Sequence, residues 1–176
     1  MENQTTSASS IMMTYGLYSG LAAILLSVTV YAMGLHYDPP FWVSIINILI
    51  SAALIFMGEK AFRSSNGGYL TFGEGLKVGM GISVVGGIIA IIYQQIFMNF
   101  IEPDFMTNMM EITRQKLVEQ NMSSEQIDQA MEMSQKFSGP AMQIAFGIIG
   151  ILFFGFIISL LVTLGLKKNP EIDEAL

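Results

Sequence analysis

The stretch "LKVGMGISVVGG", Leu76–Gly87, decides the fold, because it combines membrane-like hydropathy with four glycines in twelve residues. Glycine costs up to about 1 kcal/mol relative to alanine inside a helix, so its frequency here needs a reason. Small residues recur every four positions, at Gly75, Gly79, Ser83 and Gly87. On a helix these positions form one stripe that lets a second helix approach closely. The spacing therefore predicts a helix-packing face.

A nucleotide-binding loop is the alternative interpretation of this stretch. A P-loop requires G-x-x-x-x-G-K-[ST], and a dinucleotide site requires G-x-G-x-x-G after a strand. "GEGLKV" and "GMGISV" both lack the last glycine, and Lys77 is not followed by Ser or Thr. The pattern therefore argues against nucleotide binding. Gly81 and Gly86 lie off the stripe, where they either thin a second face or let the helix bend.

The composition indicates a membrane protein. Of 176 residues, 52% are hydrophobic and only 12% are charged, whereas a typical soluble domain has about 25% charged residues. The formal net charge of −6 argues against nucleic acid as a partner. The chain has no cysteine and a single histidine, His36, which excludes disulfides and multi-histidine metal sites.

Four segments are long and apolar enough to cross about 30 Å of hydrocarbon, which takes about 20 residues. They cover residues 11–35, 41–57, 76–97 and 141–166, approximately, and Lys77 is their only charged residue. The sequence therefore predicts an all-α integral membrane protein, a bundle of four transmembrane helices that forms a single domain over residues 1–176.

The distribution of basic residues predicts the orientation, because Lys and Arg favour short cytoplasmic segments. Lys60 and Arg63 lie between the second and third spans, in residues 58–75, and Lys167 and Lys168 follow the fourth. We therefore expect both termini and residues 58–75 to lie in the cytoplasm. Residues 99–140 are then extracytoplasmic.

The long segment between the third and fourth spans has helical periodicity. Pro103 can open a first helix, and Ser123 can cap a second one, with Gln126 completing a capping box. The pattern predicts an extracytoplasmic helical hairpin between the third and fourth membrane helices, lying over the outer ends of the bundle.

Three stretches carry a resemblance to a known family: "NGGYLTFGEGLKVGM" (residues 66–80), "FIEPDF" (100–105) and "SSEQIDQAMEMSQKFSGP" (123–140). The chain resembles domain-of-unknown-function family 4199, small four-span membrane proteins of Bacteroidetes-type bacteria. The resemblance covers nearly the whole chain. It implies a multi-pass protein of the bacterial inner membrane with this topology, but no catalytic residue. It also implies an accessory role near lipid-linked sugar metabolism.

Small residues at helical spacing also occur outside the third span. The first span has Gly16 and Gly20, and the fourth has Gly155 and Ser159. Such stripes favour tight packing within the chain, with a homodimer contact as the alternative. The expected partners are the lipid bilayer and other membrane proteins or a second copy of the chain.

Charged residues near the inner ends of the spans indicate interfacial anchors. Glu74 and Lys77 are three residues apart, a spacing that allows an ion pair on a helix, and Glu59, Lys60 and Arg63 are interpreted in the same way. A gate or a docking point for a cytoplasmic partner is the functional alternative.

Two groups of residues offer candidate sites. Polar side chains near the outer end of the spans suggest a vestibule for a carrier or channel: Tyr93, Gln94, Gln95, Asn99 and Gln143. Eight of the fourteen methionines fall between residues 98 and 142, and thioethers bind Cu(I). The candidate metal ligands are Met106, Met109, Met110, Met131 and Met133, although methionine also simply fills irregular apolar gaps.

No reactive constellation accompanies these features, so we predict that the protein is not an enzyme and uses no cofactor. The leading hypothesis is a structural or accessory component of the inner membrane that supports lipid-linked sugar or envelope processes. A small-molecule carrier or channel with a polar outer vestibule, and an extracytoplasmic Cu(I)-binding protein, are the alternatives.

Overall fold

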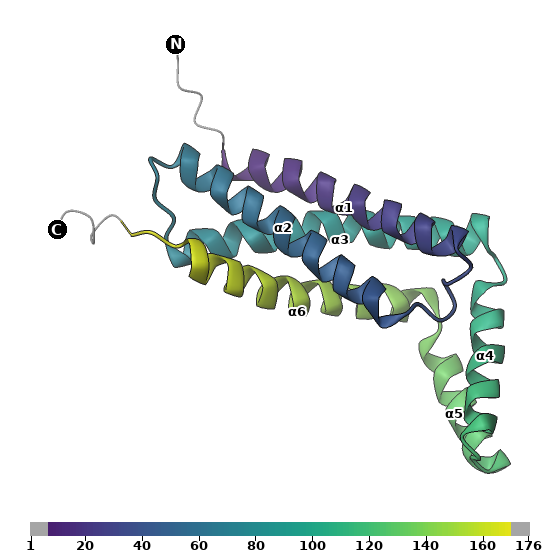
Figure 1. Ribbon diagram of the computed structural model, residues 1–176. Coiled ribbons are helices and arrows are strands. Elements are labelled where there is room, and N and C mark those ends of the chain that lie inside the picture. Colours follow the sequence, from purple (N-terminus) through teal and green to yellow (C-terminus); the bar gives the residue numbers. More distant parts are fainter. Residues whose placement is uncertain (1–6, 170–176) are drawn as a thin grey trace.

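The computed structural model describes residues 7–169, and within them the chain forms helices only. Figure 1 shows their arrangement. They are α1 (Ala8–Ala32), α2 (Phe41–Ser65), α3 (Phe72–Ile96) continued by the π-helical turn η1 (Phe97–Ile101), α4 (Phe105–Glu119), α5 (Ser124–Phe137) and α6 (Pro140–Leu166). Apart from one isolated bridge between Leu70 and Lys168, no β-pairing occurs in this part of the chain. The all-α prediction is confirmed.

Among residues 7–169, four helices are long and apolar enough to cross a membrane: α1, α2, α3 with η1, and α6. Their bounds differ from the expected spans mainly at α2, which continues to Ser65. The link to α3 is therefore residues 66–71, and the first half of the expected loop 58–75 is helical. The reason is that Glu59, at the start of that expected loop, is buried between helices instead of meeting water.

The centre of the bundle is α3, which packs against α1, α2 and α6. Figure 1 shows α1 and α6 along opposite sides of α3, with α2 crossing over it. Buried apolar side chains from three helices form the core: Ile11, Ile55, Val78 and Ile82. Because α3 contacts three neighbours, it needs small residues on more than one face.

The predicted stripe on α3 faces α6. A Cβ added at Gly79 would stand 2.4 Å from Ser159 Oγ, and one at Gly75 would stand 2.5 Å from Thr163 Cγ2. In the opposite direction, a Cβ at Gly155 would stand 2.7 Å from Ser83 Cβ. These separations are far below van der Waals contact, so small side chains of each helix pack directly against the glycine backbone of the other. Gly87, the last residue of the stripe, faces Ile151.

A second close contact lies between α3 and α1. A Cβ at Gly86 would stand 2.9 Å from Ser19 Cβ, while Gly16 and Gly20 face Val85 and Ile89. Gly81 of α3 faces Met12 of α1. The glycines off the stripe therefore thin a second face. Both faces of α3 and their partner glycines therefore make contacts within the chain. A homodimer contact through one stripe stays a prediction.

The helices α4 and α5 lie side by side in opposite directions, at the end of the bundle away from the start of α1 and the end of α6 (Figure 1). The predicted capping box of Ser123 and Gln126 at the start of α5 is confirmed. The first helix of the pair, α4, begins at Phe105. Pro103 lies two residues before it and therefore does not open the helix as predicted. The pair runs across the bundle axis and projects past α6. We expected it to lie over the end of the bundle, but it covers only part of that end.

Candidate ligand-binding cavity

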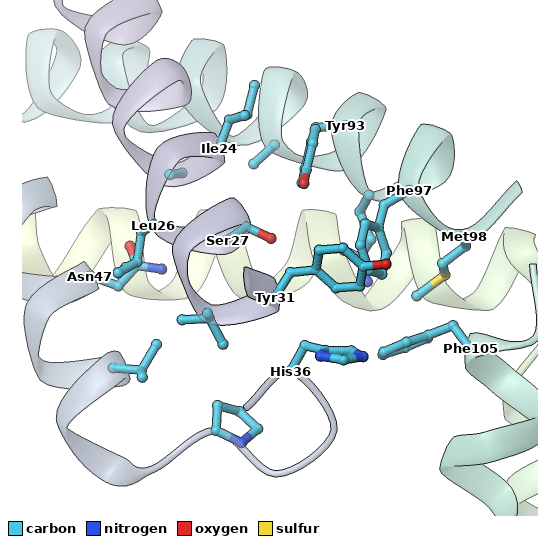
Figure 2. Close-up of a pocket in the computed structure, with 16 residues that line it drawn as sticks. Ile24, Leu26, Ser27, Tyr31, His36, Asn47, Tyr93, Phe97, Met98 and Phe105 are labelled. Atoms are coloured by element: carbon cyan, nitrogen blue, oxygen red, sulfur yellow. The ribbon is translucent and has the colours of Figure 1, made fainter. Parts of the chain in front are cut away.

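A cavity of about 330 Å³ lies between α1, α2 and α3, near the end that carries α4 and α5. This volume is at the lower end of the range of ligand sites, about 300–1,000 Å³. The lining is mostly apolar, with a few polar groups interspersed: Ser27, Tyr31, His36, Asn47, Tyr93 and Gln94. Figure 2 shows Tyr31, Tyr93 and Phe97 gathered on one side of the cavity, with Asn47 at the other.

Aromatic rings close the cavity at the α4–α5 end. The ring of His36 lies 4.9 Å from that of Tyr31, 6.3 Å from Phe97 and 6.2 Å from Phe105, centroid to centroid. In Figure 2 the rings of His36 and Phe105 meet at this end. Phe97 is brought into the cluster at the start of η1, where α3 changes to π-helical geometry. Such turns are rare and often occur at functional sites.

Glu102 holds this closure together. Its carboxylate accepts a hydrogen bond from the hydroxyl of Tyr37, and His36 Nε2 lies 3.0 Å from Glu102 Oε2. The side chains of His36 and Glu102 are only 16% and 17% exposed, so the pair is largely shielded from solvent. The connection between α1 and α2 is thereby fixed to the chain between η1 and α4.

Helix α4 adds two further contacts to the same connection. Asn108 Nδ2 donates to Tyr37 Oη at 2.7 Å, and Lys116 Nζ lies 2.8 Å from Asp38 Oδ1. The hydrogen bond to Glu102 raises the pKa of Tyr37 above its ordinary value, and the bond from Asn108 acts in the opposite direction. The sequence did not indicate this site, because His36 and Glu102 are far apart in the chain and form no motif.

A second cavity of about 200 Å³ lies deeper in the bundle. Ala23, Asn47 and Ala90 line both cavities, so the two spaces adjoin. Hydroxyl groups of Ser51 and Ser83 contribute to the deeper one, together with small residues of α3 and α6. The close packing of α3 therefore gives way to a space that reaches from the aromatic closure toward the middle of the bundle.

The predicted vestibule residues divide into two groups. Tyr93 and Gln94 line the larger cavity, whereas Gln95, Asn99 and Gln143 do not. Asn99 Nδ2 donates to the carbonyl of Gln95 at 2.7 Å. Gln143 Nε2 donates to the carbonyl of Ser138 at 2.6 Å and lies 3.4 Å from Met106 Sδ. The side-chain amides of Asn99 and Gln143 therefore stabilise local backbone and the start of α6.

The methionines proposed as copper ligands lie on the α4–α5 pair. Four are half-buried: Met106, Met109, Met110 and Met131. Met133 is 62% exposed, so it does not fill a gap between helices. Cu(I) binding by these thioethers stays a prediction.

Two expectations about charged residues are wrong. Glu74 Oε2 accepts from the backbone N–H of Thr71 at 2.9 Å, in the capping box that starts α3, and forms no ion pair with Lys77 among the described residues. Glu59 is fully buried and accepts from Thr163 Oγ1 at 3.0 Å, so it is not an interfacial anchor. Arg63, by contrast, donates to the carbonyls of Gly68 and Leu166 at the bundle end.

Comparison with known proteins gives one match. No curated protein and no solved structure matches the chain significantly. The family model described as "Protein of unknown function (DUF4199)" matches residues 14–168. This range includes all four apolar helices almost completely, as well as His36, Glu59 and Glu102. The chain therefore belongs to the DUF4199 family.

Proposed function

We propose that the protein is a multi-pass protein of the bacterial inner membrane, with the start of α1 and the end of α6 on the cytoplasmic side. Both lie at the same end of the bundle (Figure 1). That end also carries Lys60, Arg63 and Lys167, in agreement with the preference of basic residues for the cytoplasm. The α4–α5 pair would then lie on the outer surface.

Within this membrane protein, we propose that the paired cavities bind a small amphipathic molecule non-covalently and that the protein serves as its carrier or receptor. The observation that carries this proposal is the 330 Å³ cavity between three membrane helices. Apolar walls suit a hydrocarbon or aromatic body, and the few hydroxyl, amide and imidazole groups suit a polar end. Catalysis is not part of the proposal.

An accessory role in envelope processes is compatible with such a ligand. The projecting α4–α5 pair favours it, because most of its charged side chains are exposed and lie beyond the bundle. A partner protein on the outer surface could contact this pair without disturbing the cavity. Co-purification with other envelope proteins, lost when residues 105–137 are replaced by a short linker, is the result this role predicts.

The ligand proposal can be tested with the full chain in lipid nanodiscs and 1-aminoanthracene, a small fluorescent amphipathic amine. Trp42 is the only tryptophan and adjoins Val43, which lines the cavity. Saturable energy transfer from Trp42 to the probe is expected. Ala90→Phe, which fills the junction of the cavities, should abolish the saturable part of the transfer.

Ala53→Phe is the matched control, because Ala53 is an exposed alanine of α2. It should leave the energy transfer unchanged. Asn47→Leu is a second cavity variant in case Ala90→Phe does not fold, and it should weaken binding. Transfer that never saturates, or that is equal in Ala90→Phe and Ala53→Phe, would show partition into lipid and contradict the proposal.

A further inference from the structure

A buried carboxyl group lies one helical turn along α2 from Ile55, which lines the deeper cavity. Glu59 of α2 is 0% exposed, and its Oε1 is 3.0 Å from Thr163 Oγ1 of α6. Within the described part of the chain, its other oxygen, Oε2, has no hydrogen-bond partner, and neither has the hydroxyl of Ser159, which is also 0% exposed. The Ser159 hydroxyl and the Glu59 carboxyl both lie close to Gly79 in the interior of the bundle.

Among residues 7–169, no positively charged side chain forms an ion pair with this carboxyl. Helices α1 and α6 have no charged residue within Ala8–Ala32 and Pro140–Leu166, and Tyr15 is the titratable side chain of α1 next to Gly58. On α2, Lys60 is exposed and Arg63 donates to two carbonyls. The ionisable residues of α3 at this end make no ion pair with Glu59 either: Lys77 is exposed, and Glu74 caps the start of the helix.

An ionised carboxylate with one hydrogen bond and no counter-ion is strongly disfavoured in such surroundings. Ionisable residues within membrane helices are rare and usually functional. We infer that Glu59, with Ser159 and Thr163, forms a proton-binding site inside the membrane bundle. The proton resides on the Glu59 carboxyl as the neutral acid, Thr163 donates to Oε1, and the acid O–H donates toward Ser159 Oγ.

The glycine stripe makes room for this arrangement. An ideal Cβ at Gly79 would stand 2.4 Å from Ser159 Oγ and 2.9 Å from Glu59 Oε1. Both oxygens therefore border the space that the missing side chain leaves open. The Ser159 hydroxyl has no hydrogen-bond partner among residues 7–169, so it offers an acceptor position for the acid O–H.

The site exchanges protons with the end of the bundle where α1 begins. Glu59 lies six residues before Ser65, the end of α2, which corresponds to about 9 Å of helix. Toward the cavities, Ile55 and Ile82 are 1% and 0% exposed and separate the carboxyl from the polar lining. This inference does not depend on the ligand proposed for the cavities, because proton binding needs no ligand.

Infrared difference spectroscopy of the full chain in lipid vesicles tests the site. At neutral pH we expect the carbonyl stretch of a protonated carboxylic acid, which shifts in D₂O and disappears in Glu59→Gln. Glu125→Gln, which changes an exposed residue of α5, should keep the band. Ser159→Ala should move the band to higher frequency, because the acid loses its hydrogen-bond acceptor.

The absence of a Glu59-dependent acid band at neutral pH would overturn the inference. A band that vanishes when sodium chloride replaces choline chloride would also overturn it, because the site would then bind a metal ion. If Glu59→Gln does not fold, two comparisons still test the site. They are the frequency of the acid band in Ser159→Ala against wild type, and the wild-type band in sodium chloride against choline chloride.

Discussion

Glu102 joins the two chain segments that close the cavity at the α4–α5 end. Its carboxylate contacts Tyr37 and His36 of the α1–α2 connection. Its own backbone N–H donates to the carbonyl of Phe97, at the end of η1. Glu102 therefore links the α1–α2 connection, through its carboxylate, to the π-helical turn that begins at Phe97, through its backbone N–H. Its loss should loosen the closure without unfolding the bundle.

We predict that Glu102→Ala destabilises the closure by about 1–3 kcal/mol, because buried hydrogen-bonding groups lose their partner. Amide hydrogen exchange should become faster over residues 35–40 and at the start of α4. Glu125→Ala is the control, since Glu125 is exposed on α5. Unchanged exchange over residues 35–40 would show that Glu102 does not hold the closure.

Tyr37 supplies a pH-dependent test of the same contact. Its pKa is raised above 10.0 because its hydroxyl donates to Glu102. A raised pKa means that the stabilisation is fully present below pH 10 and is lost as the pH rises through the folded-state pKa. The tyrosinate absorbance of the native protein minus that of Tyr37→Phe should therefore titrate above pH 10. A midpoint at or below 10 would contradict the hydrogen bond.

At the scale of elements, the glycine faces of α3 set the spacing of the bundle. Gly79 and Gly75 admit side chains of α6, and Gly86 admits Ser19 of α1. In a bilayer the lipid is as apolar as the helix surfaces, so close packing and dispersion must hold the helices together. Added bulk at these positions should therefore destabilise the bundle more than the improved helix propensity stabilises it.

Gly79→Ala tests this balance. The methyl group would meet Ser159 Cβ at 2.7 Å, an atom that cannot move without the backbone, and overpacking costs about 1–3 kcal/mol. The gain in helix propensity is at most about 1 kcal/mol, so the free energy of unfolding in sodium dodecyl sulfate should fall. Gly150→Ala, on α6 with nothing within 4 Å, should be neutral or stabilising. Equal effects of the two substitutions would rule out the packing role.

The four apolar helices and the capping box of Ser123 could be predicted from the sequence, because hydropathy and capping depend on nearby residues. The stripe of small residues was likewise visible at Gly75, Gly79 and Ser83. Contacts between distant segments could not be predicted: His36 meets Glu102, and Glu59 meets Thr163, only once the helices pack. Nothing in the local pattern distinguishes Glu59 from an exposed charge such as Lys60.

At the scale of the whole molecule, the orientation in the membrane can be measured directly. The chain has no cysteine, so Ser64→Cys at the end of α2 and Ser124→Cys at the start of α5 each introduce one thiol. Both serines are exposed. In intact cells stripped of the outer membrane, an impermeant maleimide should label Ser124→Cys, and Ser64→Cys only after lysis. The reverse pattern would invert the proposed topology, and labelling of both would contradict it.

The central claim is that the paired cavities hold a small amphipathic molecule in the native membrane. The most direct measurement is mass spectrometry of the small molecules released by denaturing the protein after purification in mild detergent. The account predicts that wild type and Ala53→Phe release the same amphipathic molecule in a fixed ratio to protein, and that folded Ala90→Phe lacks it. Identical released molecules from all three proteins, or none from wild type, would contradict the claim.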